Sequence, residues 1–401
     1  MIFNLSMIIK SIAELEGKLV DKTVVVRVDF NIPVIEGKIS DYTRIMSSLQ
    51  TINYLQAQRA KIVLVTHFGR PEGKTDPALS LAFLVSELTK ILRRDVKFSY
   101  QHTGHEPKQI IESMKAGDIL LLENVRFNKN EELNNKKFAL DLASLGDVYV
   151  NEAFSCSHRP HASIVGIAAH LPSYAGFLFL NEVKNLTLVV EDVNKQSLAI
   201  IGGKKVSTKL HILANLSQKM NKLAIVGAMA NTFLKAKGYS IGESFYENEL
   251  LEEAKNILEK SKAEILLPDD FICISNTVSW KLKNLSSIQA DDKIFDIGPS
   301  SAFLICQAIY NSEVVVWNGP LGVFEDKRFA FATDTIARFI GARTHTGAIK
   351  SIAGGGDTVS AINNSHLTEY FSYISTAGGA FIELLEGKKL PGLCVLLNET
   401  K

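Results

Sequence analysis

The chain has 401 residues, which is too long for one small core, and a usual domain size of ~150 residues predicts two or three domains. Hydrophobic residues make up 46% and charged residues 22% of the chain, as is ordinary for soluble globular proteins. The net charge of +1 argues against a general nucleic-acid or membrane-surface binder, and no apolar run approaches the ~18–20 residues of a membrane span.

The cysteines and the N-terminus indicate a reducing compartment. Four widely spaced cysteines form no Cys-x-x-Cys pair, which predicts free thiols rather than disulfides or a zinc site. They are Cys156, Cys273, Cys306 and Cys394. The apolar N-terminal stretch is short and has its first positive charge at Lys10, the reverse of a secretory signal. We expect a cytoplasmic protein, and either Met1 or Met7 as its start.

Apolar runs of four to six residues alternate with stretches of helical period. In the first half, the expected strands are Thr23–Val28, Lys61–Thr66, Asp118–Leu122 and Asp147–Val150. In the second half they are Ser197–Ile201, Lys222–Val226, Glu264–Leu267, Lys293–Ile297, Glu313–Trp317 and Lys350–Ala353. The helical patterns between them include Arg44–Gln58, Leu79–Leu92, Glu247–Lys262 and Phe329–Arg343. Because the runs are continuous rather than alternating, we expect parallel strands covered on both faces, and therefore an α/β fold with right-handed crossovers.

One long amphipathic pattern interrupts this alternation. Residues 177–195 have helical period but no strand partner, and they separate two strand-helix series. No Gly/Ser-rich or Pro-rich linker marks a boundary, so we expect this helix itself to join two doubly wound domains with parallel sheets.

Polar and basic residues follow each expected strand of the first half. Ligands of doubly wound sheets bind outside the carboxyl ends of the strands. Here these ends read Asp29-Phe30-Asn31, His67-Phe68-Gly69-Arg70, Asn124-Val125-Arg126 and Ser157-His158-Arg159, and Arg44 follows at an expected helix start. Each residue alone has an ordinary structural explanation, such as a turn cap or a surface ion pair. Together they predict a pocket for a small, multiply anionic molecule.

The second half repeats this arrangement with glycines and lysines. The segment 202–209, GGKKVSTK, follows an expected strand and has neither the P-loop spacing nor Gly-x-Gly-x-x-Gly. Lys205 and Lys209 still place ammonium groups beside a helix N-terminus. Farther on, the turn from Gly354 to Thr358 joins an expected strand to an expected helix, where free N–H groups bind anions. Asp357 has two interpretations: it caps this helix, or it meets a divalent cation that accompanies phosphates.

From end to end, the chain resembles the phosphoglycerate kinases. The blocks that carry the resemblance are, in family order, RVDFNIP, HFGRP, LLENVRF, SHRPHAS, GGKKVSTK, DIGP, WNGPLGVFE, AGGGDT and STAGGA. The resemblance implies two Rossmann-like domains joined by a helix, and reversible phosphoryl transfer between 1,3-bisphosphoglycerate and MgADP to give 3-phosphoglycerate and MgATP. It implies a glycerate-binding domain at 1–176, a connecting helix at 177–195, a nucleotide-binding domain at 196–380 and a segment at 381–401 that returns to the first domain. We expect a monomeric, hinge-bending enzyme of glycolysis that acts on these small molecules.

The resemblance also implies roles for individual residues. Those expected to bind the glycerate substrate are Asp29, Phe30, Asn31, Arg44, His67, Phe68, Gly69, Arg70, Arg126 and Arg159. Those expected to bind the nucleotide are Gly203, Lys205, Lys209, Gly298, Pro320, Glu325, Gly354, Gly355, Gly356, Asp357 and Thr358. Catalytic roles are expected for Arg44, Lys205, Lys209, Gly355 and Gly379, and Asp357 is expected to meet the Mg²⁺ that accompanies ADP or ATP. Lys204, Ala228 and Ala377 depart from the family pattern near the nucleotide side, which leaves the nucleotide affinity open.

The residue types suit this chemistry. A carboxylate leaves an acyl phosphate without needing a proton, and the terminal oxygen of ADP is already ionised, so the reaction needs no general base. What remains is to position two anions and to stabilise charge on the transferred group. The arginines and the phosphate-binding turn are expected on separate domains. This implies that the domains close before the phosphoryl group is transferred. A dehydrogenase is disfavoured because the dinucleotide fingerprint is missing, and a catalytically inactive nucleotide-binding protein of the same fold is the alternative.

Overall fold

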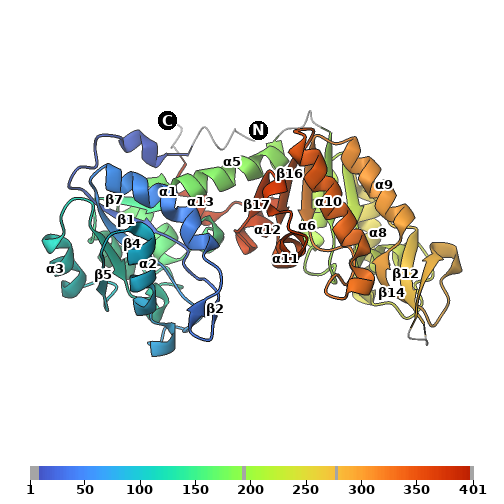
Figure 1. Ribbon diagram of the computed structural model, residues 1–401, viewed down its shortest axis with the longest axis horizontal. Helices are drawn as coiled ribbons and strands as arrows, with labels where there is room; N and C mark the ends of the chain where they lie inside the picture. The colour runs from blue at the N-terminus through green and yellow to red at the C-terminus, as the bar shows by residue number, and fades with distance from the viewer. Residues whose placement is uncertain (1–8, 192–195, 276–278, 398–401) are drawn as a thin grey trace. The chain divides into compact units, whose positions relative to one another are not determined.

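The computed structural model describes residues 9–191, 196–275 and 279–397 of the chain. These form two compact units, shown as a ribbon in Figure 1. The first unit comprises Met1–Lys184 and Lys389–Lys401, and the second comprises Asn185–Lys388. Both candidate start methionines and the last four residues of the expected connecting helix, 192–195, lie outside the described residues. Among the helices that the structure describes, none has the length and apolar character needed to cross a membrane.

The first unit is built on a six-stranded sheet whose strands are all parallel. In spatial order they are β5 (Val96–Ser99), β6 (Ile119–Leu122), β4 (Lys61–Val65), β1 (Thr23–Arg27), β7 (Val148–Asn151) and β8 (Ser173–Ala175). The helices of this unit are α1 (Thr43–Ala57), α2 (Leu84–Leu92), α3 (His105–Ser113), α4 (Lys136–Ala143) and α13 (Pro391–Cys394). The strands predicted at 23–28, 61–66, 118–122 and 147–150 are all present within one or two residues of the predicted ends.

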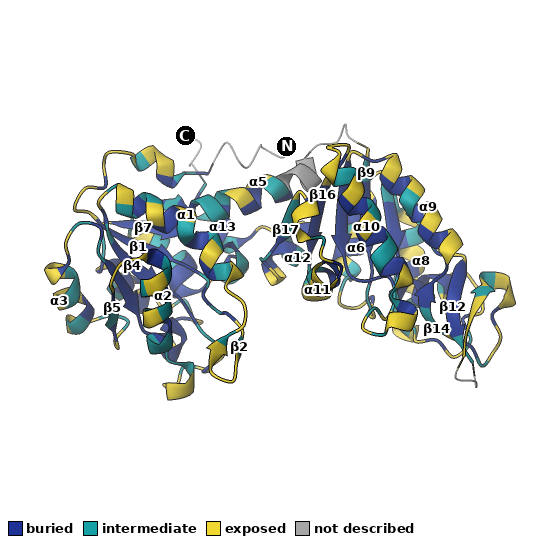
Figure 2. Cartoon of the chain, viewed as in Figure 1, coloured by how far each residue is buried: buried dark blue, intermediate teal, exposed yellow. Residues whose placement is uncertain are grey.

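Burial on both faces explains why β1 reads as an unbroken apolar run. Val24 and Val26 point into one hydrophobic cluster with Ile52 of α1, while Val25 points into a second cluster with Leu142 of α4. Side chains of a strand alternate between faces, so a sheet covered on both sides needs apolar residues at consecutive positions. Figure 2 shows the consequence: the strands are buried, and the helices keep exposed outer faces.

The C-terminal segment belongs to the first unit. The backbone N–H of Gly392 donates to the carbonyl of Ser157 (2.9 Å), and the N–H of Lys10 donates to the carbonyl of Leu396 (3.0 Å). Helix α5 (Phe177–Glu191) begins against the buried carboxylate of Glu152. That carboxylate accepts the N–H groups of Leu178 (3.1 Å) and Phe179 (3.3 Å), and it therefore caps the helix.

The second unit contains another parallel six-stranded sheet. Its spatial order is β11 (Glu264–Leu266), β10 (Lys222–Ile225), β9 (Ser197–Ile201), β15 (Val314–Asn318), β16 (Lys350–Gly354) and β17 (Tyr373–Ser375). The helices are α6 (Leu210–Lys219), α7 (Met229–Ala236), α8 (Leu251–Lys260), α9 (Pro299–Tyr310), α10 (Phe331–His345), α11 (Gly356–Asn364) and α12 (Gly379–Leu385). The expectation of two doubly wound, Rossmann-like units is confirmed.

One predicted parallel strand was wrong. The run Lys293–Ile297 forms β14, which lies in a separate antiparallel sheet with β12 (Asp270–Ile274) at its centre and β13 (Trp280–Asn284) on the other edge. In β14, Lys293 is exposed and the next two residues are only half-buried, so the strand is not covered on both faces. The apolar run predicted the strand but carried no information about which sheet it joins.

Candidate active site

The first candidate site lies where the strands of the first unit end. Strands β1, β4, β6 and β7 are parallel neighbours, so their carboxyl ends lie along one edge of the sheet. The segments after these strands carry Asp29, His67, Arg126 and Arg159, and the first turn of α1 carries Arg44. This edge, with the side chains just named, is called the arginine rim below.

Asp29 organises one part of the arginine rim. Its Oδ2 accepts hydrogen bonds from Arg44 Nη1 (2.8 Å) and from the hydroxyl of Ser155, and its Oδ1 accepts the N–H of Asn31 (3.1 Å). Arg44 Nη1 also donates to the carbonyl of Asn31 (3.0 Å). Arg44 is thus oriented by a carboxylate while about a third of its side chain, 32%, is exposed. An anionic ligand can therefore reach a guanidinium that is already held in place.

The loop after β4 is held by backbone contacts. Gly69 has φ +63°, and a Cβ at this position would lie 2.8 Å from Leu79 Cδ2, so only glycine fits without a shift. The N–H of Gly69 donates to Asn31 Oδ1 (2.9 Å), and its carbonyl accepts from Arg126 Nη1 (2.9 Å). Gly69 therefore links three of the strand ends through its own backbone.

Asn124 is a positioning residue that was not among the site residues predicted from the sequence. Its side chain is fully buried; its Oδ1 accepts the N–H groups of Phe68 (3.2 Å) and Arg126 (3.1 Å), and its Nδ2 donates to the carbonyl of Phe68 (2.7 Å). Its amide side chain in the segment after β6 was the signal that the sequence offered, and the contacts that give it this role are between distant segments. Phe30, in contrast, is fully buried in the core, and its side chain faces away from solvent. Arg70 follows Gly69 and is exposed.

The electrostatics of the arginine rim are strongly positive. Burial, followed by the charges of Arg27, Arg126 and Arg44, lowers the pKa of His67 well below its ordinary value. A second histidine nearby, His161, has its pKa lowered to about 3 by burial and then by several of the same arginines. Both histidines are therefore neutral at physiological pH. Concentrated arginine charge with neutral histidines suits a ligand that carries carboxylate and phosphate groups.

The second candidate site lies where β9, β10 and β15 end. Gly202, Gly227 and Gly319 come so close here that side chains cannot fit between them. A Cβ on Gly202 would lie 2.1 Å from the carbonyl oxygen of Pro320, and one on Gly319 would lie 2.2 Å from that of Gly202. A Cβ on Gly227 would lie 2.7 Å from the backbone nitrogen of Gly203. The strand ends are therefore a backbone surface, which a ligand can approach closely.

The two predicted lysines occupy different environments. Lys209 Nζ donates to the carbonyls of Gly202 (2.7 Å) and Asn318 (3.0 Å). Burial lowers the pKa of Lys209 to about 8, while the carboxylate of Asp357 acts in the opposite direction. Lys205 is exposed and lies in the loop before α6, because that helix begins only at Leu210. Of the two lysines expected beside a helix N-terminus, Lys209 is the N-cap residue of α6, and Lys205 precedes it by four residues.

The glycine turn after β16 is a helix N-terminus with free donors. Gly355 has φ +95° and is the N-cap of α11, whereas Asp357 is exposed in the first turn of the helix. The interpretation of Asp357 as the helix cap is therefore wrong. The side chain of Asn318 donates to the carbonyl of Gly354 (2.7 Å), and the hydroxyl of Thr358 accepts the N–H of Gly319 (2.6 Å). These two bonds fix the turn against the end of β15.

A cavity of about 460 Å³ adjoins these strand ends. Of the residues predicted to bind the nucleotide, Gly203, Pro320, Glu325 and Asp357 line it. Further lining residues include Lys204, Ala228, Phe245, Phe271, Phe295, Ile297 and Val323. Apolar and aromatic walls with a few polar groups are typical of a site for a small molecule.

Several predicted residues lie outside the wall of this cavity. The Cβ position of Gly298 points at the carboxylate of Asp270, 2.2 Å away, so this glycine serves close packing at the start of α9. Gly379 is the exposed first residue of α12, and Gly356 has open space around its Cβ position. Both keep backbone N–H groups at helix starts accessible.

The departures from the family pattern have different surroundings. Lys204 Nζ lies 5.2 Å from the centre of the Phe245 ring, a cation–π contact at the cavity wall. Ala228 lines the same cavity, whereas Ala377 is buried and its N–H donates to the Ser375 hydroxyl (3.2 Å). The replacement at 228 is thus in a position to affect ligand fit.

Two doubly wound units, one with an arginine rim and one with glycine turns at its strand ends, define an α/β protein with candidate ligand sites at the carboxyl ends of its strands. The chain belongs to the phosphoglycerate kinase family, whose sequence model matches residues 12–388. It is 47% identical over 386 residues to the phosphoglycerate kinase of Orientia tsutsugamushi (strain Ikeda), covering 94% of this chain and 95% of that one. It is 45% identical over 384 residues to that of Caulobacter vibrioides (strain NA1000 / CB15N), covering 94% and 97%. The fold is similar to the structure of phosphoglycerate kinase from Coxiella burnetii, with a TM-score of 0.89 at 38% identity, covering 97% of this chain and 98% of that one. The resemblance inferred from the sequence blocks is confirmed.

Proposed function

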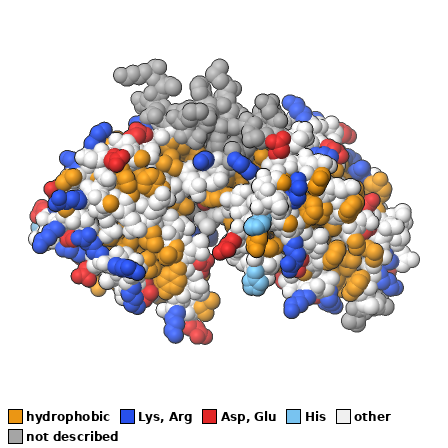
Figure 3. All heavy atoms as spheres, turned by 45° about the horizontal axis from the view of Figure 1, so that its top comes forward, with side chains coloured by type: hydrophobic (Ala, Val, Ile, Leu, Met, Phe, Trp, Pro, Cys, Tyr) orange, Lys and Arg blue, Asp and Glu red, His pale blue; other side chains and the backbone are white. Residues whose placement is uncertain are grey.

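We propose that this chain transfers a phosphoryl group reversibly between 1,3-bisphosphoglycerate and MgADP, giving 3-phosphoglycerate and MgATP. Two features found together in this member of the family support the proposal most directly. They are the arginine rim and a second candidate anion site at the N-terminus of α11. Two anion sites of different character suit a reaction between two phosphorylated molecules. Figure 3 shows basic and acidic side chains intermingled on the visible face of each unit, in keeping with the net charge of +1.

The arginine rim binds the glycerate substrate in this proposal. Arg44, Arg126 and Arg159 carry planar guanidinium groups that pair with carboxylate or phosphate oxygens through two parallel hydrogen bonds. Asp29 holds Arg44 at 2.8 Å before any ligand arrives, and Gly69 holds Arg126 through its carbonyl at 2.9 Å. Because these donors are oriented in advance, ligand binding orders few side chains.

The second unit binds the nucleotide in this proposal. The cavity of about 460 Å³ receives the base and the ribose, with Glu325 at its wall, and the N–H groups of the α11 turn face the phosphates. Mg²⁺ usually binds proteins through one or two carboxylates and keeps phosphates and water as its other ligands. Asp357 fits that pattern because its exposed carboxylate borders the cavity. When bound, the ion would offset negative charge on the phosphates.

Positioning and charge stabilisation carry the chemistry. The leaving carboxylate needs no proton, so the site requires cations and N–H groups rather than a base. Arg44 from one unit and Lys205 from the other are assigned to the phosphoryl group during transfer, with Lys209, Gly355 and Gly379 as further donors. The proposal therefore requires the two ligands to be brought together during turnover, which is the closure expected from the sequence.

A coupled assay with ADP and 1,3-bisphosphoglycerate tests the proposal. We expect ATP formation that depends on added Mg²⁺ and is lost in Arg44→Ala. ATP formation without added Mg²⁺ would remove the metal from the proposal. If the folded, purified protein binds ADP in calorimetry but forms no ATP, the catalytically inactive alternative holds instead. The expected monomer is checked by light scattering, and the expected cytoplasmic location by fractionation of the source cells.

A further inference from the structure

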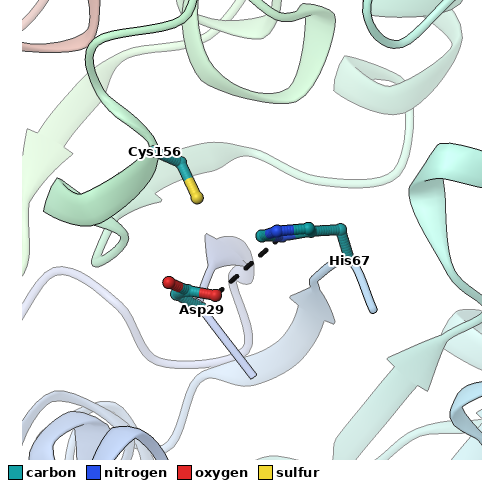
Figure 4. Close-up of side chains that lie close together, drawn as sticks. All are labelled: Asp29, His67 and Cys156. Atoms are coloured by element: carbon teal, nitrogen blue, oxygen red, sulfur yellow. Dashed lines mark ion pairs between the residues drawn. The ribbon is translucent and has the colours of Figure 1, made fainter. Parts of the chain in front are cut away.

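Three side chains at the arginine rim carry atoms of the kind that bind metal ions. Donor atoms of Asp29, His67 and Cys156 all lie within 4.8 Å of one another. Figure 4 shows these three side chains. Zinc sites in proteins use oxygen, nitrogen and sulfur donors of these three kinds. The space, however, already has a cation beside it. Arg27 Nη2 lies 3.1 Å from His67 Nδ1 and 3.9 Å from Cys156 Sγ. A second cation would meet the charge of this guanidinium, so a metal site is not supported.

Arg27 is held firmly in this position. It is the last residue of β1 and only 1% exposed. Its Nε donates to the Ser163 hydroxyl (2.9 Å), and its Nη1 donates to the carbonyl of Val28. The Ser163 hydroxyl in turn donates to the fully buried carboxylate of Glu131 (2.5 Å). Glu131 therefore balances the buried charge, and the guanidinium has little freedom to turn away from His67.

The contact between Arg27 and His67 determines which ring nitrogen of His67 carries the proton. A guanidinium has only N–H donors and stays protonated in proteins, so His67 Nδ1 must be the acceptor and carries no proton. The competing partner, Asp29 Oδ1, lies 3.9 Å from the same nitrogen, beyond hydrogen-bond distance. A neutral imidazole without a proton on Nδ1 carries it on Nε2.

We propose that Arg27 is a positioning residue that fixes His67 as the neutral Nε2–H tautomer, so that His67 meets the glycerate substrate as a hydrogen-bond donor and not as an imidazolium. This inference rests on the proposed function for the identity of the ligand. The groups that face His67 from the surrounding elements are Arg27, Asp29, Arg44, Arg126, Cys156 and His161. Three of them are arginines, and their charges oppose protonation of the ring, in agreement with the lowered pKa of His67.

The tautomer is measurable without any activity. Two-bond ¹⁵N–¹H correlation spectra of the full-length, ¹⁵N-histidine-labelled protein report which ring nitrogens carry a proton. The chain has nine histidines, and the signals of His67 are those that are missing from the spectrum of His67→Asn. We expect the Nε2–H pattern for His67 from about pH 5.5 to 8, with no titration. A proton on Nδ1, or a titration near the ordinary value of about 6.5, would overturn the proposal.

Two variants separate the roles of the ring nitrogens. His67→Gln places an amide N–H near the position of Nε2, whereas His67→Asn places an amide oxygen near the position of Nδ1. We expect His67→Gln to bind 3-phosphoglycerate within a few-fold of the native protein, and His67→Asn to bind about 10-fold more weakly or worse. The opposite order contradicts the inference. If neither the native protein nor the variants bind 3-phosphoglycerate, while the Nε2–H pattern is present, the proposed function fails and the tautomer stands.

Discussion

The hydroxyl of Thr358 accepts the backbone N–H of Gly319 at 2.6 Å, and this bond ties the first turn of α11 to the end of β15. Thr358 is 1% exposed, so no water can replace its oxygen if the hydroxyl is lost. Two segments that are 39 residues apart in the sequence thereby form one surface beside the candidate nucleotide cavity. The first turn of α11, which we propose to face the phosphates, is thus anchored to the end of β15.

Thr358→Val tests this anchor, because valine keeps the shape but leaves the Gly319 N–H without an acceptor. We expect a loss of about 1–3 kcal/mol in the free energy of unfolding. We also expect a higher KM for ADP, with the KM for the glycerate substrate unchanged. The matched control is Thr346→Val, whose exposed hydroxyl donates to the carbonyl of Arg343 and should shift stability by less than about 0.5 kcal/mol. Equal effects of both substitutions would show that the hydrogen bond between Thr358 and Gly319 does not contribute to stability.

Asp357→Asn tests whether the nucleotide site is correctly assigned to the second unit and the glycerate site to the first. We expect weaker binding of Mg-nucleotide and nearly native binding of 3-phosphoglycerate, because Asp357 borders the cavity of the second unit while the arginine rim lies in the first. Calorimetric titration with each ligand separately gives the two affinities. A large loss of 3-phosphoglycerate affinity would show that the ligands are assigned to the wrong units.

Lys205→Ala is expected to lower kcat by about 10²–10³ or more, since removal of one preorganised donor to a developing charge costs roughly 2.7–4 kcal/mol. Arg44→Ala should cause a loss of the same size from the other unit. Lys204, which precedes Lys205 in the sequence, gives a matched control. Lys204 contacts the Phe245 ring at 5.2 Å, so Lys204→Ala should change the KM for nucleotide a few-fold and leave kcat nearly native. Steady-state kinetics on folded Lys205→Ala decide the matter, because a near-native kcat removes Lys205 from the mechanism.

Asp296 should make stability depend on pH. Burial raises its pKa to about 7, although the N–H groups of Ile297 and Ala332 both donate to its carboxylate. The folded protein therefore keeps a proton that the unfolded chain releases near pH 4, so stability is highest below that value and falls as pH rises to about 7. The slope is at most about 1.4 kcal/mol per pH unit for one proton. Relative to Asp296→Asn, the native Tm should therefore fall between pH 4.5 and 7 and then stay level. A native Tm that does not change relative to the variant over this range contradicts the prediction.

The elements that the sequence predicted well are those decided by local pattern. Consecutive valines in β1 require cover on both faces, and the strand-end residues Asp29, His67 and Arg126 share one edge because the strands are parallel. The rest depends on contacts between distant segments. The sequence of Lys293–Ile297 gives no indication that this strand pairs antiparallel with β12. Likewise Asn124 gains its role only because Phe68 lies beside it in space.

Arg27 shows the same limit at the site itself. In the sequence it is one of eight arginines in the first half, and nothing separates it from those that face solvent. The structure places Arg27 in the interior, with Ser163 and Glu131, 136 and 104 positions away, as the partners that keep its charge there. A role that arises from three distant residues has no local signature.

The close approach of Gly202, Gly227 and Gly319 has a consequence for how this chain tolerates mutation. At each position the first side-chain carbon would overlap backbone atoms of a neighbouring strand end, and backbone has no rotamer to change. These three codons should therefore accept no other amino acid in a saturation library selected for folding alone, before any ligand is offered. At Gly356, where the Cβ position meets open space, the same library should accept alanine and serine and lose variants only when selected for function. Comparing the two selections would thus separate glycines that the fold requires from glycines that only the ligand requires.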